Sequence, residues 1–163
     1  MKNPFIAIDP GTRSLGWALF DDHLIGAGVV RAQGLDDMLK RLRDFAPPLI
    51  TGDRDVVIEI PQIYRASKSK GDPNDLIPVA IVAGAVGVML RGPTASVRMF
   101  TPHVWKGSVP KPIVHSRVFA VLNDQELENL AFARDRTPKG SQLDLLDAVS
   151  IGIWHQGRMS PRR

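Results

Sequence analysis

The sequence predicts one α/β domain with a mixed sheet, in which an antiparallel hairpin leads into parallel strands. Two observations support this fold class. Short, nearly uncharged segments typical of buried strands recur along the chain, and the later ones alternate with segments that have the apolar pattern of helices. The length of 163 residues suits one compact domain and leaves little room for a second. The chain has no internal repeats or low-complexity tracts, which argues against a solenoid.

Five segments are predicted to be strands because they are continuously apolar or rich in β-branched residues. The second and third are separated only by a short turn that contains Asp21 and Asp22, so they are expected to form a hairpin. The fourth is interrupted only by Glu59. The predicted strands are residues 4–9, 15–21, 24–31, 55–60 and 96–101.

Four segments are predicted to be helices. The first has apolar residues at helical spacing from Leu35 onward, and Pro47 and Pro48 are expected to end it. A polar segment rich in Asp, Glu and Arg separates the last two helices. The predicted helices are residues 35–46, 76–90, 113–122 and 142–155. The domain is expected to cover residues 1–157 and to be followed by a basic C-terminal tail, residues 158–163.

The composition excludes several kinds of function. The chain has no cysteine, so disulfide frameworks, thiolate zinc sites and cysteine nucleophiles are excluded. The longest uncharged stretch, residues 76–90, is shorter than the roughly 20 residues that a membrane-spanning helix needs, and we see no secretory signal. Lys and Arg number 21 against 17 Asp and Glu, and this mild positive balance permits a polyanionic partner without requiring one.

Carboxylates interrupt the apolar segments at three places. Asp9 ends the first predicted strand, Glu59 lies inside the fourth, and Asp144 and Asp147 lie one turn apart on one face of the last helix. An ionised carboxylate in apolar surroundings is costly unless a cation meets it, and no Lys or Arg lies at helical spacing beside the last two. Carboxylate oxygens are ligands that suit Mg²⁺ or Mn²⁺. One divalent-metal site would therefore account for all four residues.

Each carboxylate also has a purely structural explanation. Asp9 can begin a Pro-Gly turn, Glu59 can face solvent on an edge strand, and Asp144 can cap the last helix. Asp147 lies one turn further into that helix, where capping no longer applies. Structural explanations would have to hold independently for each carboxylate, whereas one metal site would explain all of them together.

Three segments carry these carboxylates, and together they resemble the motifs of the RuvC-type Holliday junction resolvases, which are ribonuclease H-like nucleases. The segments are IAIDPGTRSLGWAL, VVIEIPQ and DLLDAVSIGI, and the resemblance spans residues 5–155. It implies a ribonuclease H-like mixed five-stranded sheet, with antiparallel first hairpins and then parallel strands, flanked by helices. It also implies that Asp9, Glu59, Asp144 and Asp147 are catalytic and hold two Mg²⁺ ions, with Mn²⁺ as a substitute.

The resemblance implies a function as well. It implies a Mg²⁺-dependent endonuclease that hydrolyses phosphodiester bonds in four-way DNA junctions during recombination and repair. It further implies a homodimer that needs no membrane and no nucleotide cofactor, located in the cytoplasm of a bacterium or of a phage-infected host. Residues 76–90 are apolar on every face, which is more than a helix covering a sheet requires, so this helix is expected to contribute to the dimer interface.

The loop of residues 61–75 departs from the family pattern. The family often has an aromatic residue three positions after the strand Glu, where this chain has Gln62, so Tyr64 is expected to stack on an unpaired base instead. Basic residues here and further along are expected to contact DNA phosphates, although they can equally be ordinary solvated surface charges. They are Arg65, Lys68, Lys70, Lys106 and Lys111.

Other functions remain open from the sequence. The segment DPGTRSLG also resembles the first phosphate loop of actin-like and sugar kinase ATPases, but those folds need two domains and a second phosphate loop. Another ribonuclease H-like nuclease, such as a YqgF-type RNA-processing enzyme or a general branched-DNA nuclease, would carry the same four acids. An inert DNA-binding module would have no electrostatic reason to keep them. The histidines show no ligand spacing: His23, His103, His115 and His155.

Overall fold

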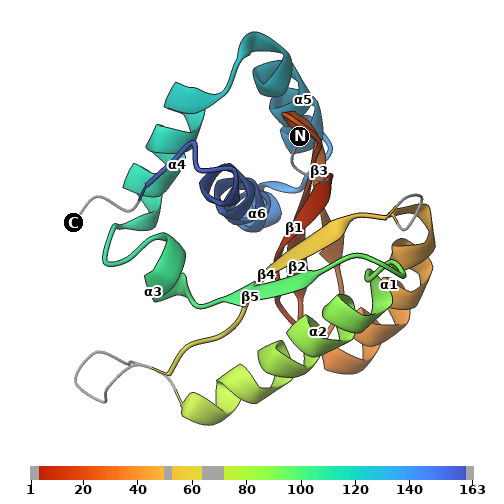
Figure 1. Cartoon of the computed structure of the whole chain (residues 1–163). Helices are drawn as coiled ribbons and strands as arrows, with labels where there is room; N and C mark the ends of the chain where they lie inside the picture. Colours follow the sequence, from red (N-terminus) through yellow and green to blue (C-terminus); the bar gives the residue numbers. More distant parts are fainter. Residues whose placement is uncertain (1–3, 50–52, 64–71, 161–163) are drawn as a thin grey trace.

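Five strands form one mixed sheet in the order β3-β2-β1-β4-β5 (Figure 1). The structure is a computed structural model and describes residues 4–49, 53–63 and 72–160. The first three strands pair antiparallel, and β4 and β5 continue the sheet in parallel on the other side of β1. This confirms the predicted fold class. The strands are β1 (Phe5–Asp9), β2 (Ser14–Phe20), β3 (Leu24–Arg31), β4 (Asp55–Glu59) and β5 (Val97–Phe100).

Helices cover both faces of the sheet (Figure 1). The helices α1 (Leu35–Leu49) and α2 (Leu76–Met89) lie on one face. On the other face α6 (Gln142–His155) packs on β1 and β2, and further helices surround it. These are α3 (Pro102–Trp105), α4 (Lys111–Val121) and α5 (Asp124–Asp135). Two short 3₁₀ turns, η1 (Pro73–Asp75) and η2 (Lys139–Ser141), precede α2 and α6. None of the helices in the described part of the chain has the length and apolar character needed to cross a membrane.

Strand alternation divides the core into two layers. The layer under α1 and α2 includes Ile8 and Ile58, whereas the layer under α6 takes the alternate residues of the same strands. Those alternate residues of β1 and β4 are Phe5, Ala7 and Val57. Asp9 and Glu59 continue this second set two positions further along each strand, so both carboxylates point toward the α6 side.

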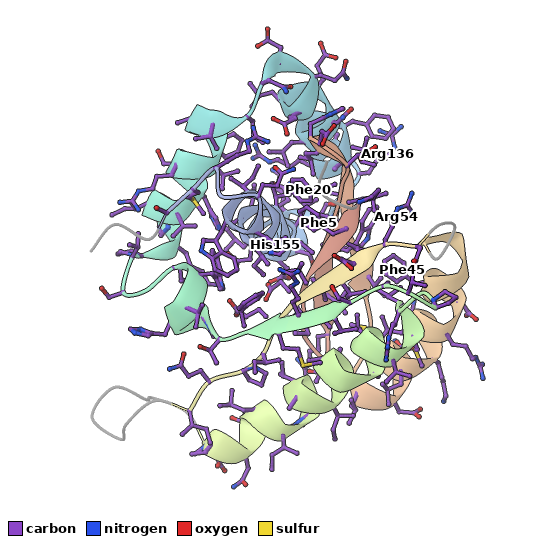
Figure 2. The ribbon with its side chains drawn as sticks, in the orientation of Figure 1. Phe5, Phe20, Phe45, Arg54, Arg136 and His155 are labelled. Atoms are coloured by element: carbon purple, nitrogen blue, oxygen red, sulfur yellow. The ribbon has the colours of Figure 1, made fainter. Side chains whose placement is uncertain are left out.

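Two glycines let α6 lie unusually close to the sheet. Phe5 and Phe20 stack at 4.9 Å between ring centroids, and the ring of His155 meets Phe5 edge-on (Figure 2). A Cβ on Gly152 of α6 would lie 2.0 Å from the Phe20 ring, and a Cβ on Gly16 of β2 would lie 2.0 Å from the backbone carbonyl oxygen of residue 144. The helix can therefore rest on the strands at both of its ends only because these two positions lack a side chain.

Two predictions about helices were wrong. The first helix was expected to end at Pro47, but α1 continues to Leu49. The fixed φ of proline is compatible with a helix. In the last turn its missing backbone N–H removes only hydrogen bonds near the helix end, so the helix can continue. The polar segment before α6 was not predicted to be a helix, but it forms α5, whose start has a capping box between Asn123 and Glu126. The spacing of Asn123 and Glu126 is the sequence signal that identifies this helix start.

The boundary of the C-terminal tail also differs from the prediction. Arg158, which was assigned to the tail, donates to the carboxylate of Glu126 at 2.6 and 2.7 Å, and Met159 is buried. Burial alone would raise the pKa of Glu126, but the bonds from Arg158 and from the backbone N–H groups of Asn123 and Leu24 lower it to about 2. These contacts make both residues part of the folded domain.

We expect Gly152→Ala to lower the free energy of unfolding by about 3 kcal/mol, because the added methyl group would overlap the buried Phe20 ring. Urea denaturation measures this change. Gly140→Ala is the control, since no atom lies within 4 Å of its added Cβ, and it should change stability by less than about 0.5 kcal/mol. Equal stabilities of the two variants would contradict the close packing of α6.

Candidate active site

The sheet places Asp9 and Glu59 next to each other. They follow Ile8 and Ile58, which are paired neighbours on the parallel strands β1 and β4. Both carboxylates therefore leave the same end of the sheet and point toward α6. The alternative that Glu59 faces solvent from an edge strand is wrong, because β4 lies between β1 and β5 and the Glu59 side chain is only 16% exposed.

The start of α6 brings Asp144 and Asp147 to the same place. Gly16 is paired with Asp9 across β1 and β2, and its missing side chain lets the backbone of Asp144 approach the strand. The helix begins at Gln142 with Ser141 as its N-cap, so the alternative that Asp144 caps the helix is wrong. The structure thus brings together the four acids that the sequence singled out.

The charge of Asp9 is poorly compensated. Burial raises its pKa well above the ordinary value, and repulsion from Asp147, Glu59 and Asp144 raises it further, while Lys111 opposes the shift. Among the described residues, no donor forms a hydrogen bond with the Asp9 carboxylate. Burial is thus the main cause of the raised pKa of Asp9, and the neighbouring carboxylates add to it.

Glu59 is held by donors from α3 and the residue that follows it. The indole Nε1 of Trp105 donates a hydrogen bond to Oε2 of Glu59, and the ammonium of Lys106 lies 3.6 Å from the same oxygen. Burial raises the pKa of Glu59, and Lys106 and Trp105 partly offset this increase. Trp105 is buried, so its indole is a fixed donor.

Asp147 is held by two donors from α4. Lys111 Nζ bonds to Oδ2 of Asp147, and His115 Nε2 lies 2.8 Å from Oδ1. Burial alone would raise the pKa of Asp147, but these two partners hold it below its ordinary value. The Asp147 side chain is 4% exposed, so a buried carboxylate has a separate partner on each oxygen.

Spacing along the last helix could not reveal these partners, because they lie on α3, on α4 and at the residue that follows α3. Lys106 and Lys111 were predicted to contact DNA phosphates, and the structure places both against the carboxylates. Trp105 and His115 were not predicted, although His115 follows Lys111 by one helical turn, a spacing that puts two donors on one face. Four residues of the predicted DNA-binding set lie outside the described residues: Tyr64, Arg65, Lys68 and Lys70.

The donors of this cluster suit a divalent cation. Four carboxylates face two lysines, so the negative groups of the cluster outnumber the lysines that reach them. Carboxylate oxygens are the ligands that Mg²⁺ and Mn²⁺ prefer. Across residues 4–49, 53–63 and 72–160, no three Asp, Glu or His side chains are arranged to hold one ion together. Protein donors instead occupy oxygens of Glu59 and Asp147.

Comparisons with solved structures identify the fold. RuvC of Thermus thermophilus in complex with a Holliday junction substrate superposes with a TM-score of 0.62 at 21% identity, covering 94% of this chain and 93% of that one. The fold is RuvC-like. A second T. thermophilus RuvC structure gives a TM-score of 0.56 at 19% identity, covering 93% and 92% of the two chains. The fowlpox virus Holliday junction resolvase gives 0.53 at 12% identity, covering 95% and 98%.

Sequence comparisons add no closer relative. No family model matches the chain, and no curated protein matches it. The similarity to the RuvC structures extends over nearly the full length of this chain. The fold that they share is the ribonuclease H-like architecture expected from the sequence.

Neutralising Asp9 and Asp147 should change stability in opposite directions in metal-free buffer. The raised pKa of Asp9 means that its ionised form destabilises the folded state, so Asp9→Asn should add about 1 kcal/mol at pH 7. This gain should disappear as the pH falls below the ordinary value of 3.8. The lowered pKa of Asp147 means that its charge stabilises the fold above that value, so Asp147→Asn should cost about 3 kcal/mol at pH 7.

Urea denaturation of both variants between pH 3 and pH 8 measures these effects. Exposed Asp36, on α1, provides the control Asp36→Asn, which should change stability by less than about 0.5 kcal/mol. If Asp9→Asn destabilised the protein at pH 7 as much as Asp147→Asn, the uncompensated charge at Asp9 would be disproved.

Proposed function

We propose that this protein is a metal-dependent endonuclease that cuts branched DNA and resolves four-way junctions. The observation that carries the proposal is the convergence of four carboxylates from β1, β4 and α6 on one side of a RuvC-like sheet. Two of the structurally similar proteins are described as a RuvC bound to a Holliday junction substrate and a Holliday junction resolvase. This likeness supports junction DNA as the substrate.

The residues of the cluster have distinct proposed roles. Asp9, Glu59, Asp144 and Asp147 would hold two Mg²⁺ ions, or Mn²⁺ in their place. The chemistry that such ions supply is activation of water and stabilisation of the leaving 3′-oxygen. The sheet and α6 fix the carboxylates in position, because Asp9 and Glu59 lie on paired strands and the α6 backbone rests on Gly16.

Positively charged residues beside the cluster would bind the DNA backbone. Lys106 and Lys111 are close enough to the carboxylates to meet a phosphate at the cleaved bond. We retain the proposal that the loop after Glu59 contacts the junction through base stacking by Tyr64 and phosphate contacts by Arg65, Lys68 and Lys70. A related nuclease that acts on RNA or on other branched DNA would share the cluster, and the choice of substrate distinguishes the two.

We expect cleavage to require Mg²⁺ or Mn²⁺ and to stop in EDTA. Asp9→Asn and Glu59→Gln should each reduce the cleavage rate by about a thousandfold or more, because each removes a carboxylate that would hold the ions. Both variants should still bind DNA, since they remove negative charge that faces phosphate. Asp36→Asn should cut at the wild-type rate, because the Asp36 side chain is 84% exposed on α1.

The assay compares four-way junctions, flaps, duplex DNA and RNA–DNA hybrids on one gel, with and without metal. Preferential symmetric cutting of the four-way junction supports a resolvase. Preference for the hybrid would favour an RNA-directed nuclease of the same fold, and undiminished cutting in EDTA would exclude the metal-dependent chemistry.

We further propose that the protein acts as a homodimer through α2. The helix buries one side on the sheet, and its other side presents apolar residues to solvent, including Ile77, Ile81 and Val88, which are 56%, 46% and 79% exposed. A groove lined by Gly84, Gly87, Val88, Arg91, Val97 and Met99 continues this surface onto edge strand β5. A second copy related by two-fold symmetry would cover the apolar surface and supply a second active site for the opposite strand.

We expect Val88→Glu to convert a dimer into a monomer without unfolding it, because the side chain is exposed and would place charge in the interface. Sedimentation velocity at micromolar concentration, with and without junction DNA, measures the change. Phe132→Glu is the matched control, since Phe132 is 60% exposed on α5, away from α2, and the dimer should persist. A wild-type protein that sediments as a monomer, also with junction DNA, would refute this assembly.

A further inference from the structure

Lys111 enters the carboxylate cluster from the solvent side. Its side chain is 53% exposed along its length, yet its ammonium group bonds to Oδ2 of Asp147, whose side chain is 4% exposed. Lys111 lies at the first position of α4, directly after Pro110. The lysine thus carries a positive charge from the surface into the centre of the site.

The ammonium group acts on more than one carboxylate. Burial alone would lower the pKa of Lys111, but the bond to Asp147 and the charges of Asp9 and Glu59 raise it above its ordinary value. Lys111 also opposes the rise in the pKa of Asp9. The ammonium group therefore stands where the surrounding carboxylates attract a cation.

The two partners of Asp147 differ in how easily they can leave. The His115 ring is 9% exposed and packed in the core beside α6, so its contact with Oδ1 is fixed by its surroundings. Lys111 holds Oδ2 through a flexible four-carbon chain that is half in solvent, so it can withdraw without repacking the core. Of the two carboxylate oxygens, Oδ2 is the exchangeable one.

We propose that Lys111 is a resident cation that occupies Oδ2 of Asp147 until a divalent metal ion replaces it. The inference rests on the proposed metal-dependent function and adds a competition between the ion and a side chain of the protein. Binding of the ion releases the ammonium group next to the cluster, where it can meet a DNA phosphate. Metal loading and capture of the substrate backbone are thereby coupled through one lysine.

Lys106 provides a matched comparison. It carries the same charge into the same cluster, but its ammonium lies 3.6 Å from Glu59 and 4.8 Å from the ring centroid of Trp105. It does not hold an oxygen of Asp147. Removing Lys106 takes away the same charge but leaves Oε2 of Glu59 bonded to Trp105, whereas removing Lys111 also frees Oδ2 of Asp147.

The experiment is a calorimetric titration of Mn²⁺ into the full chain without DNA, using wild type, Lys111→Met, Lys106→Met and Lys111→Arg. We expect Lys111→Met to bind Mn²⁺ about tenfold more tightly than wild type, and Lys106→Met no more than about threefold. Lys111→Arg keeps a charged donor at the same position and should bind with an affinity close to that of wild type.

Thermal unfolding provides a second measurement. In EDTA, Lys111→Met should melt below wild type, because Asp147 loses the partner of one oxygen. Saturating Mn²⁺ should raise its melting temperature by more than it raises that of wild type, because tighter binding stabilises the folded state further.

The outcomes separate this inference from the proposed function. If wild type binds Mn²⁺ and Lys111→Met leaves the affinity unchanged, the competition is disproved and the metal site stands. An equal gain in affinity for Lys111→Met and Lys106→Met also overturns the competition, since charge alone then explains it. Absence of Mn²⁺ binding in all four proteins overturns both the inference and the metal site.

Discussion

The close contact between α6 and the sheet is the constraint on which the site depends. Gly16 and Gly152 leave room for the helix backbone and for the Phe20 ring, and a side chain at either position would push α6 outward. Because Asp144 and Asp147 are on α6 while Asp9 and Glu59 are on the sheet, the distance between the two pairs of acids follows from this packing. Gly16 is therefore as much a part of the site as the four acids.

The same packing concentrates negative charge at one edge of the core, and α3 and α4 compensate it only in part. Trp105 and Lys106 hold Glu59, Lys111 and His115 hold Asp147, and Asp9 keeps an unfavourable ionised form. A fold selected for stability alone would gain little from this arrangement, since buried carboxylates in mutual repulsion cost free energy. The remaining negative charge is one that a bound cation would offset.

The sequence was sufficient to predict what depends on local pattern. Apolar runs predicted all five strands, and an acid at the end of one buried strand and inside another singled out Asp9 and Glu59 before any geometry was known. It was not sufficient for contacts between elements distant in the chain. Trp105 lies 46 residues from Glu59, and His115 lies 32 residues from Asp147, so no spacing rule connects them. The helix α5 was missed because its face toward the core is short and its composition is polar.

The order of α6 and the strands that it covers has a consequence for biosynthesis. The sheet face that carries Phe5, Ala7 and Phe20 is made before α6, which covers that face and follows Phe20 by more than 120 residues. During elongation this apolar face has no native cover, while the opposite face can already close on α1 and α2. One apolar layer of the nascent chain can thus be covered early, and the other stays uncovered until α6 has been made.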